Sequence, residues 1–498
     1  MVKILEINAQ NPWWSQGVEF VRYDKSLMEA KPIFFERRPI ETKNGNIYIL
    51  RGPRQVGKTT YIKDFVRKLI EGGVPSEAIL YLSLDFFTSR REMRNAINYF
   101  LESRIDAPQI YILLDEITSI EDWNLELKYL SDQGLIKRGV ILATGSSALK
   151  LKEKGELLPG RGVEGNEYYV KPLSFRSFAI QVIDFIAPRL TRDEFRYTLI
   201  KLKSILPSCS LNIEATVNVI RKEVEKIIPF KMELSYLFRL YLMTGGFPGV
   251  INHYLSNYYL QQENTINTSI AEIFVRDVFG DLARLQKQEN TIRQLLRAIV
   301  ERYGSRYSYS NLAREIEKSH TTTIDYLEFM EDSFICFVLY AYDFNKKNAK
   351  AKGDKKVYFF DPFIFHSVRS YLGGNEVWNI IASSLEHEEL MGKMVEGMVL
   401  SHLRMLGEIP LMKVGSTFLW YYYDKSGKEI NAIFQGDGGY SAVEIKYRGQ
   451  VDERDIKRIS PVKRYFVLSR EEVGWKGDVI ILPVDIFLAL LPVSERII

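Results

Sequence analysis

Between residues 46 and 150, short runs of mainly apolar residues alternate with segments in which apolar residues recur at helical spacing. The apolar runs lie within residues 47–50, 79–85, 109–117 and 139–147, and such runs are typical of strands buried in a parallel sheet. After the first run, apolar side chains recur at helical spacing, at Tyr61, Ile62, Phe65, Val66 and Leu69. The pattern predicts an α/β domain built on a parallel sheet.

The turn after the first predicted strand has a composition suited to phosphate. Residues 52–60 read Gly-Pro-Arg-Gln-Val-Gly-Lys-Thr-Thr and fit the G-x-x-x-x-G-K-[ST] phosphate loop at every fixed position. Glycines let backbone N–H groups approach a polyanion, and the N-terminus of the next helix favours negative charge. An ordinary glycine-rich turn is the alternative, but the strand before and the helix after favour a nucleotide site. We expect ATP to contact Gly52, Pro53, Arg54, Gln55, Val56, Gly57, Lys58, Thr59 and Thr60.

Four side chains are expected to act on phosphate, Mg²⁺ and water. Lys58 would reach the β- and γ-phosphates, and Thr59 would place its hydroxyl on Mg²⁺. Asp115 and Glu116 follow an apolar run in the Walker B arrangement, which brings carboxylates to the carboxyl edge of a parallel sheet. We expect Asp115 to hold Mg²⁺ through water and Glu116 to orient or deprotonate the attacking water.

Five segments together resemble one family of proteins. They are residues 52–60, Leu-Asp-Glu-Ile at 114–117, Thr-Gly-Ser-Ser at 144–147, Leu-Pro-Gly-Arg at 158–161 and Thr-Gly-Gly-Phe-Pro at 244–248. In this order they resemble the prokaryotic AAA+ ATPases, common in archaea, that carry a C-terminal nuclease-like domain. The resemblance spans nearly the whole chain and implies an ATPase core, a small helical lid closed by the glycine turn, and a winged helix.

The resemblance also suggests roles for side chains beyond the fourth strand. AAA+ ATPases keep a polar residue there that senses the γ-phosphate, and Thr144 and Ser146 are the candidates. A capped helix N-terminus at Ser146 or Ser147 explains these hydroxyls equally well. Arg161 lies on a Gly/Pro loop, where it either offers an arginine finger to a neighbouring subunit or is simply an exposed side chain.

Residues 175–360 divide into two helical regions. Residues 175–290 read as amphipathic helices interrupted at Pro207, Pro229 and the glycine turn, which we interpret as the lid. Helical patterns at 291–300, 309–317 and 321–330, then strands at 334–340 and 356–360, follow in the order of a winged helix-turn-helix.

The loop between those last two strands concentrates lysines, whereas residues 291–332 hold about as many acidic as basic side chains. Lysines on such a wing suit contact with DNA phosphates. A solvated hairpin and a protein-binding surface are the alternatives. The expected DNA contacts are Lys346, Lys347, Lys350 and Lys352, and Lys355 and Lys356 follow in the same run.

The C-terminal region combines a helix at 391–404 with strands near 417–423, 429–434 and 440–447. Glu444 and Lys446 lie two apart on a predicted strand and match the E-x-K half of the PD-(D/E)xK nuclease pattern. Glu396, on the preceding helix, resembles an additional acidic residue of that pattern.

The strand before the E-x-K pair departs from the nuclease pattern. Asn431 stands where the resemblance leads us to expect an aspartate, and an amide oxygen brings no net charge to a cation. Glu429 lies two residues earlier on the same face but in a shifted register. We therefore expect a nuclease-like binding domain rather than an active nuclease. Residues 446–470, with eight basic and three acidic side chains, suit phosphate contact, and a solvated helix and strand face is the alternative.

Composition adds little to this picture. The 498 residues include 67 basic and 63 acidic side chains, so the balance of charge gives weak support to nucleic-acid binding. Cys209 and Cys336 lie far apart, which favours two core thiols in a reducing compartment. The chain lacks an apolar stretch of membrane-spanning length and a secretory hydrophobic region, so we expect a cytoplasmic protein. Many Lys, Glu, Tyr and Ile residues suit a thermophile.

These inferences combine into one organisation and three functional hypotheses. We expect an α/β chain with a P-loop NTPase parallel sheet, divided into a cap (1–45), an ATPase core (46–175), a helical lid (176–289), a winged helix (290–365) and a nuclease-like α/β domain (366–498). The main hypothesis is a Mg²⁺-dependent ATPase whose nucleotide state controls engagement of duplex or single-stranded DNA. The alternatives are a nucleotide-controlled signalling or scaffold ATPase and an ATP-driven nuclease. The resemblance also implies a homo-oligomer.

Overall fold

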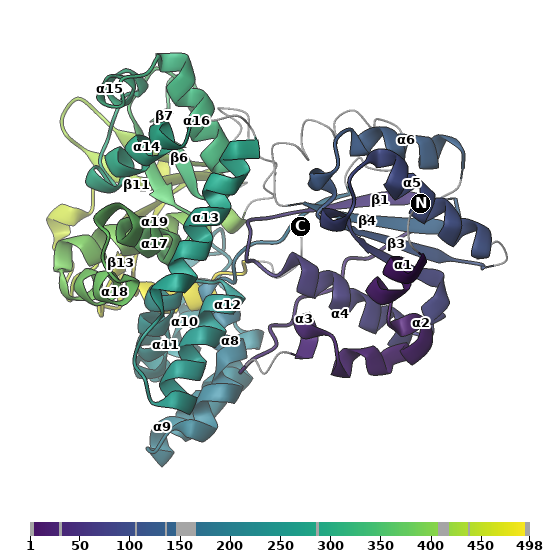
Figure 1. The fold of residues 1–498 in the computed structure, drawn as a ribbon. Coiled ribbons are helices and arrows are strands. Elements are labelled where there is room, and N and C mark those ends of the chain that lie inside the picture. The colour runs from purple at the N-terminus through teal and green to yellow at the C-terminus, as the bar shows by residue number, and fades with distance from the viewer. Residues whose placement is uncertain are drawn as a thin grey trace. The chain divides into compact units, whose positions relative to one another are not determined.

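The structure is a computed structural model, and its chain forms two compact units with a boundary between Lys171 and Pro172 (Figure 1). The residues that it describes are 4–28, 32–104, 107–134, 137–145, 166–284, 288–406, 418–436 and 439–493.

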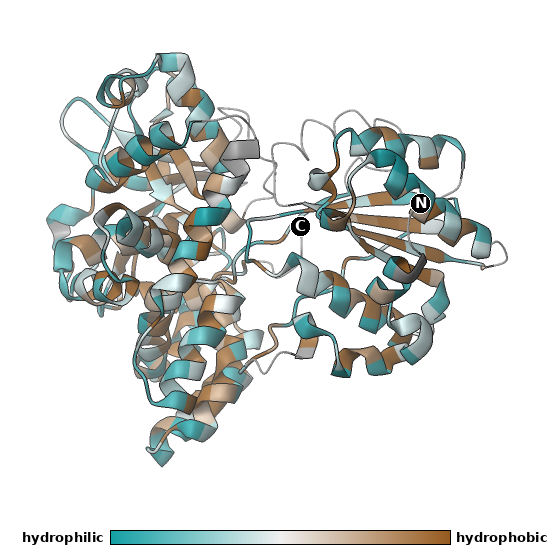
Figure 2. Ribbon diagram, in the orientation of Figure 1, coloured by the Kyte–Doolittle hydropathy of each residue, from teal (hydrophilic) through white to brown (hydrophobic). Residues whose placement is uncertain are grey.

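The first unit is built on a five-stranded parallel sheet in the order β2-β3-β4-β1-β5. Its strands are β1 (Asn46–Arg51), β2 (Ile79–Ser83), β3 (Ile110–Asp115), β4 (Gly139–Gly145) and β5 (Glu167–Tyr169). Their side chains are almost all buried, which explains the continuous apolar runs in the sequence (Figure 2). The predicted parallel α/β fold is confirmed.

Helices cover both faces of this sheet. Helices α5 (Arg90–Ser103) and α6 (Trp123–Asp132) pack Phe100 and Leu127 onto the face that carries Ile47 and Ile112. Helix α4 (Lys58–Glu71) covers the other face, where Phe65 meets Tyr111 edge to face. The N-terminal segment comprises α1 (Ile4–Gln10), α2 (Trp13–Gln16), a 3₁₀ helix (Gly17–Arg22) and α3 (Lys25–Met28). Helix α1 contacts edge strand β2, whereas the 3₁₀ helix and α3 contact α4.

The second unit begins with a group of helices. They are α8 (Phe175–Ile186), α9 (Asp193–Ile205), α10 (Val217–Ile227), α11 (Lys231–Thr244), α12 (Pro248–Ser256) and α13 (Thr268–Arg284). Pro207 and Pro229 lie in 3₁₀ segments between helices, and Gly245 and Gly246 separate α11 from α12. The interruptions therefore fall where the sequence places them, because proline removes a helical hydrogen bond and glycine permits a positive φ.

Three further helices lead into a small antiparallel sheet. They are α14 (Glu289–Glu301), α15 (Tyr309–Glu315) and α16 (His320–Asp332), followed by β6 (Cys336–Tyr340) and β9 (Lys355–Phe359). Tyr307, between α14 and α15, bridges to Lys355. Strands β7 (Tyr342–Asp343) and β8 (Asn348–Ala349) form a hairpin within the β6–β9 connection, which we call the wing (residues 341–354).

The unit ends in a six-stranded mixed sheet of order β10-β11-β12-β13-β15-β14. Helices α17 (Pro362–Gly373), α18 (Val377–Glu386) and α19 (Glu388–Leu406) precede it, and α20 (Val484–Leu490) follows it. Its strands are β10 (Leu419–Tyr423), β11 (Glu429–Gly436), β12 (Gly439–Ile445), β13 (Val462–Ser469), β14 (Gly474–Lys476) and β15 (Val479–Pro483). The first three strands are antiparallel neighbours, whereas β12, β13 and β15 run parallel.

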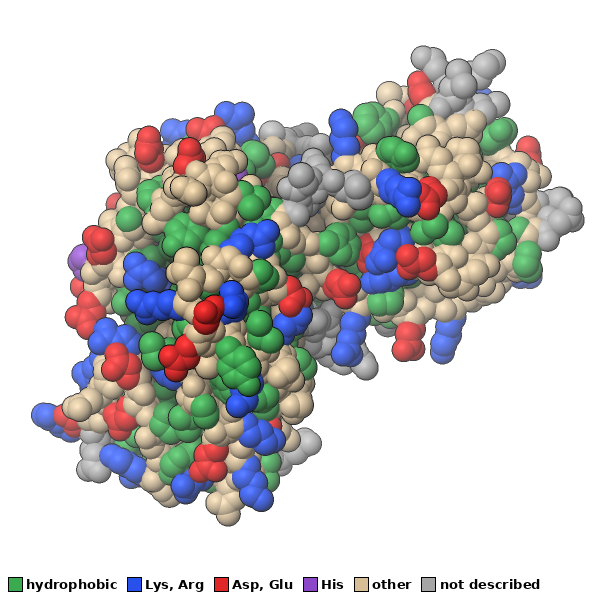
Figure 3. Space-filling view, turned by 90° about the horizontal axis from the view of Figure 1, so that it is seen from below, with side chains coloured by type: hydrophobic (Ala, Val, Ile, Leu, Met, Phe, Trp, Pro, Cys, Tyr) green, Lys and Arg blue, Asp and Glu red, His purple; other side chains and the backbone are tan. Residues whose placement is uncertain are grey.

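Three global features bear on the expectations from composition. Cys209 and Cys336 are both buried and unbridged, as expected of core thiols. Among the described residues, every helix is too short or too polar to cross a membrane. Basic and acidic side chains are interspersed over the face drawn in Figure 3.

Candidate nucleotide site

The phosphate loop connects the carboxyl end of β1 to the first turn of α4. Gly57 caps α4 with a φ of 93°, and Gln55 has a φ of 62°. A glycine suits the first of these because side chains destabilise positive φ. Gly52 has a different role, since a Cβ there would overlap the carbonyl oxygen of Val170 beside the loop. The two motif glycines therefore have different roles: Gly57 permits the turn, and Gly52 permits the close approach of the backbone of Val170.

Lys58 is anchored on this loop. Its ammonium donates to the carbonyl oxygens of Gly52 at 3.0 Å and Pro53 at 2.9 Å, and the side chain is buried. The loop thus holds a fixed positive charge at the N-terminus of a 14-residue helix, whose dipole adds to it. Such an arrangement suits a polyphosphate.

The carboxylate of Asp115 accepts hydrogen bonds from neighbouring hydroxyl groups. Thr59 donates to its Oδ2 at 2.7 Å, and Thr144 of β4 donates to its Oδ1. Glu116 follows with a φ of 51°, and its backbone N–H donates to the Thr144 hydroxyl at 3.2 Å. A non-glycine residue in the left-handed region is strained, and such strain is concentrated at functional sites. Four of the predicted site residues, Thr59, Asp115, Glu116 and Thr144, therefore lie together.

The donor set fits a magnesium ion bound with a nucleotide. Mg²⁺ prefers oxygen ligands and is usually held by one or two protein oxygens together with phosphates and water. Thr59 and Asp115 offer a hydroxyl and a carboxylate that already face each other. Within the described residues, no three His, Cys, Asp or Glu side chains gather as a separate metal cage.

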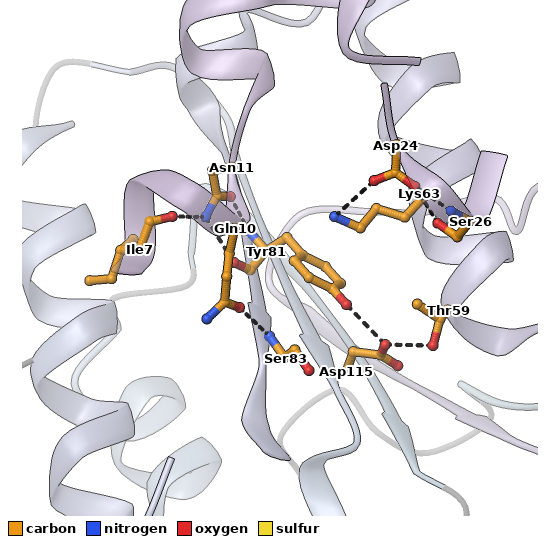
Figure 4. Close-up of polar contacts among 10 residues, drawn as sticks. All are labelled: Ile7, Gln10, Asn11, Asp24, Ser26, Thr59, Lys63, Tyr81, Ser83 and Asp115. Carbon is orange, nitrogen blue, oxygen red and sulfur yellow. Dashed lines mark hydrogen bonds and ion pairs between the residues drawn. The ribbon is translucent and has the colours of Figure 1, made fainter. Parts of the chain in front are cut away.

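Two contacts around this site escaped sequence reasoning. Tyr81 of β2 donates its hydroxyl to Asp115 Oδ2 at 3.0 Å (Figure 4). Arg37 of the N-terminal segment donates to the carbonyl oxygen of Val56 in the phosphate loop at 3.3 Å. Neither residue belongs to a motif, and only the register of β2 against β3 and the path of the N-terminal segment reveal them.

Two other predicted site residues lie outside the described part of the chain. Ser146, the second sensor candidate, and Arg161, the candidate arginine finger, both fall in residues 146–165. Of the two sensor candidates, the described structure therefore includes Thr144, whose hydroxyl donates to the Walker B carboxylate.

The lysines of the wing and those of β9, which follows it, differ in exposure. Lys346, Lys347 and Lys352 are exposed, whereas Lys355 and Lys356 are buried. Lys350 is partly buried, with its ammonium 4.7 Å from the centre of the Tyr423 ring. The base of the wing packs on the C-terminal sheet, where the hydroxyls of Tyr342 and Tyr440 lie 2.7 Å apart.

The predicted nuclease-like residues form two adjoining sets of contacts. Glu396 and Glu429 both bind the ammonium of Lys356, at 3.2 and 2.6 Å. Glu444 pairs with Lys446 at 2.8 Å and accepts the backbone N–H of Asn431 at 3.2 Å. Burial raises the pKa of Glu444, although Lys446 partly opposes this effect. Each carboxylate thus has a partner from the protein itself.

Three family models match parts of this chain. Residues 44–179 match the family model of an AAA domain. In the second unit, residues 235–374 and 391–486 match two domains of unknown function, DUF8612 and DUF4143. The first unit therefore combines the parallel sheet and phosphate loop with the sequence signature of an AAA domain.

Two curated relatives and one solved structure show the range of similarity. An uncharacterized protein of Methanocaldococcus jannaschii, MJ1637, is 28% identical over 68% of this chain. An uncharacterized protein of Haemophilus influenzae is 23% identical over 60% of this chain. The chain spans 64% of the length of each of these relatives. The Aeropyrum pernix ORC1 protein, solved in complex with DNA, is 12% identical, with coverage of 73% of this chain and 92% of that one and a TM-score of 0.32.

Proposed function

We propose that the protein binds ATP with Mg²⁺ at the phosphate loop and hydrolyses it to ADP and phosphate. The observation that carries this proposal is the hydrogen bond of 2.7 Å from Thr59 to Asp115. It joins the last part of the phosphate-loop motif to the Walker B carboxylate, although the two residues are far apart in the sequence. Both groups are hard oxygen donors, which magnesium prefers.

Each residue has a distinct task in this proposal. Lys58 neutralises phosphate charge, and Thr59 and Asp115 hold the cation, which supplies charge stabilisation to the phosphoryl group when it is bound. Glu116 orients and deprotonates the attacking water from its strained position after β3. Thr144 fixes both carboxylate residues, because its hydroxyl donates to Asp115 and accepts from the Glu116 backbone.

Phosphate release with and without Mg²⁺ tests the proposal, with two variants of Thr59. Thr59→Ala removes the hydroxyl and is expected to lower the rate by about 100-fold or more, since catalytic ligands of this kind contribute several kcal/mol. Thr59→Ser keeps the hydroxyl and should keep most of the rate. Equal rates in all three proteins, or a wild-type rate that is independent of Mg²⁺, would remove this assignment.

A second candidate is control of DNA engagement by the wing, and the exposure of Lys346, Lys347 and Lys352 favours it. We propose that residues 290–365 act as a winged helix that contacts phosphates through these wing lysines. Helix α16 is less suited to this contact, because its exposed side chains include Asp325 and Glu328, whose negative charges phosphate repels. DNA contact would then depend on the wing more than on α16.

Binding of a labelled duplex and a labelled single strand across a salt series tests the wing. The triple variant Lys346→Ala, Lys347→Ala, Lys352→Ala should bind more weakly and show a shallower dependence on salt. Lys393→Ala is the control for loss of one positive charge, because Lys393 pairs with Glu389 elsewhere on the unit. If wild type shows no binding at moderate salt, with or without nucleotide, a scaffold role for the second unit replaces the DNA role.

A further inference from the structure

We propose that Tyr81 is a positioning residue for Asp115, and that the N-terminal segment of residues 4–28 holds Tyr81 in place (Figure 4). The Tyr81 hydroxyl donates to Asp115 Oδ2 at 3.0 Å, on the same oxygen that accepts the Thr59 hydroxyl at 2.7 Å. The inference rests on the proposed ATPase function, because Asp115 has its role there as a holder of Mg²⁺.

Strand register brings the phenol to the carboxylate. Tyr81 pairs with Leu113 and Ser83 pairs with Asp115, so Tyr81 and Asp115 lie on neighbouring strands and on the same face of the sheet. Both side chains are buried. A buried polar group is stable only when it is hydrogen-bonded, and Tyr81 provides Asp115 with a donor that the phosphate-loop motif does not.

Three hydroxyl groups donate hydrogen bonds to the two carboxylate oxygens of Asp115. Thr144 donates to Oδ1, whereas Thr59 and Tyr81 share Oδ2. Thr59 is also the expected metal ligand, so its hydroxyl is the donor that cation binding engages. Tyr81 and Thr144 then hold the carboxylate, one at each oxygen, and limit its rotation while the cation binds.

The N-terminal segment fixes the backbone of Tyr81. Asn11 accepts the backbone N–H of Tyr81 at 2.6 Å and donates to its carbonyl oxygen at 2.9 Å, in the manner of an additional strand residue. Gln10 accepts the backbone N–H of Ser83 at 2.7 Å in the same way. The edge of β2 beside Asp115 is therefore closed by side chains from residues that precede the phosphate loop by about 40 positions.

The same segment fixes the ring of Tyr81. The ammonium of Lys63 on α4 lies 3.8 Å from the centre of the Tyr81 ring and 4.9 Å from that of Trp13. Asp24 of the N-terminal segment lies 3.5 Å from this ammonium. Cation–π contacts of a desolvated lysine are stronger than exposed ones, so the ring has little freedom to leave Asp115.

The variant Tyr81→Phe tests the proposal because it removes the hydroxyl and keeps the ring. Tyr111→Phe is the matched control, since Tyr111 is also buried on this face of the sheet but its hydroxyl accepts from Gln109. Binding of Mn²⁺ in the presence of a nonhydrolysable ATP analogue is measured from the electron paramagnetic resonance signal of the free ion. Affinity for the analogue in the presence of a chelator is measured in parallel.

Tyr81→Phe should bind Mn²⁺ about tenfold more weakly, which is the size of effect expected for one hydrogen bond to a charged group. Its affinity for the metal-free analogue, and both affinities of Tyr111→Phe, should match wild type. Wild-type Mn²⁺ affinity in Tyr81→Phe would overturn the inference, and so would an equal loss of metal-free nucleotide affinity, which indicates a purely structural role. If wild type itself binds neither analogue nor cation, the proposed function fails before the variant is compared.

Discussion

The ammonium of Lys356 lies 2.6 Å from a carboxylate oxygen of Glu429, and Glu396 approaches the same ammonium at 3.2 Å. Lys356 belongs to β9 beside the wing, whereas the two glutamates belong to the C-terminal sheet and its preceding helix. Burial alone would lower the pKa of Lys356, but Glu396 and Glu429 raise it, so the lysine stays charged. Two of the candidate nuclease residues, Glu396 and Glu429, are thus partly exposed members of an ion cluster around a buried lysine.

Replacing Lys356 by Met should destabilise the protein by about 3 kcal/mol, since two carboxylates then lose their buried cation. Denaturant unfolding measures the change. Lys352→Met removes an exposed lysine from the same loop and should change the unfolding free energy little. Adding Glu396→Gln and Glu429→Gln to Lys356→Met should restore part of the loss. A Lys356→Met protein as stable as wild type would show that the cluster contributes nothing.

The glycine turn between α11 and α12 offers a second test, on backbone geometry. Gly245 has a φ of 61°, and a Cβ there would overlap the carboxylate of Asp361. That carboxylate accepts the backbone N–H of Gly246 at 2.7 Å and caps α17 through the N–H of Phe363 at 2.8 Å. Gly245→Ala should therefore cost about 3 kcal/mol of unfolding free energy.

Gly249 is the control for this substitution. It lies in α12 with open space around its Cβ position. Gly249→Ala should stabilise the protein by about 0.5–1 kcal/mol, because alanine favours a helix over glycine. Equal effects of the two substitutions in thermal unfolding would contradict the role given to the turn.

Buried histidines predict that stability depends on pH. His402 accepts the backbone N–H of Phe175 through Nε2 at 2.9 Å and donates from Nδ1 to Met398, and burial lowers its pKa to about 4. Burial also lowers the pKa of His366 to about 4. Because the folded state binds these protons less readily, its stability is full above the unfolded pKa of about 6.5 and is lost as pH falls toward 4.

Each histidine should contribute a slope of up to about 1.4 kcal/mol per pH unit over that window. Denaturant unfolding at pH 7, 6 and 5 measures the slope, and His402→Gln should reduce it. His320→Gln, at an exposed position, should leave it unchanged. A slope that is the same in wild type and His402→Gln would exclude His402 as a contributor.

The nucleotide site was predictable where its chemistry is local. Residues 52–60 carry their own turn and helix signals, and Asp115 follows a run long enough to mark a buried strand. The first four strands of the parallel sheet were predicted for the same reason. The hydrogen bond between Thr59 and Asp115 then follows because β1, which leads into the phosphate loop and Thr59, and β3, which ends at Asp115, end at the same edge of the parallel sheet.

Contacts that depend on register or on burial were not predictable. Tyr81 reaches Asp115 only because β2 and β3 pair with a particular offset, which no local pattern encodes. The lysine run of the wing reads as uniformly solvated, yet Lys355 and Lys356 are buried because β9 continues the small sheet beneath the wing. Strands β14 and β15 and helices α17, α18 and α20 lie in segments to which the sequence pattern assigned no elements.

The central claim is that Glu116 activates water at a Mg²⁺-ATP site, and one comparison tests it most directly. ATP hydrolysis and ATP affinity are measured for wild type and Glu116→Gln at saturating Mg²⁺. Glu116→Gln should bind ATP as tightly as wild type and turn over at about one hundredth of the wild-type rate or below, because the amide keeps the shape of the side chain but cannot accept a proton. Turnover equal to that of wild type would contradict it.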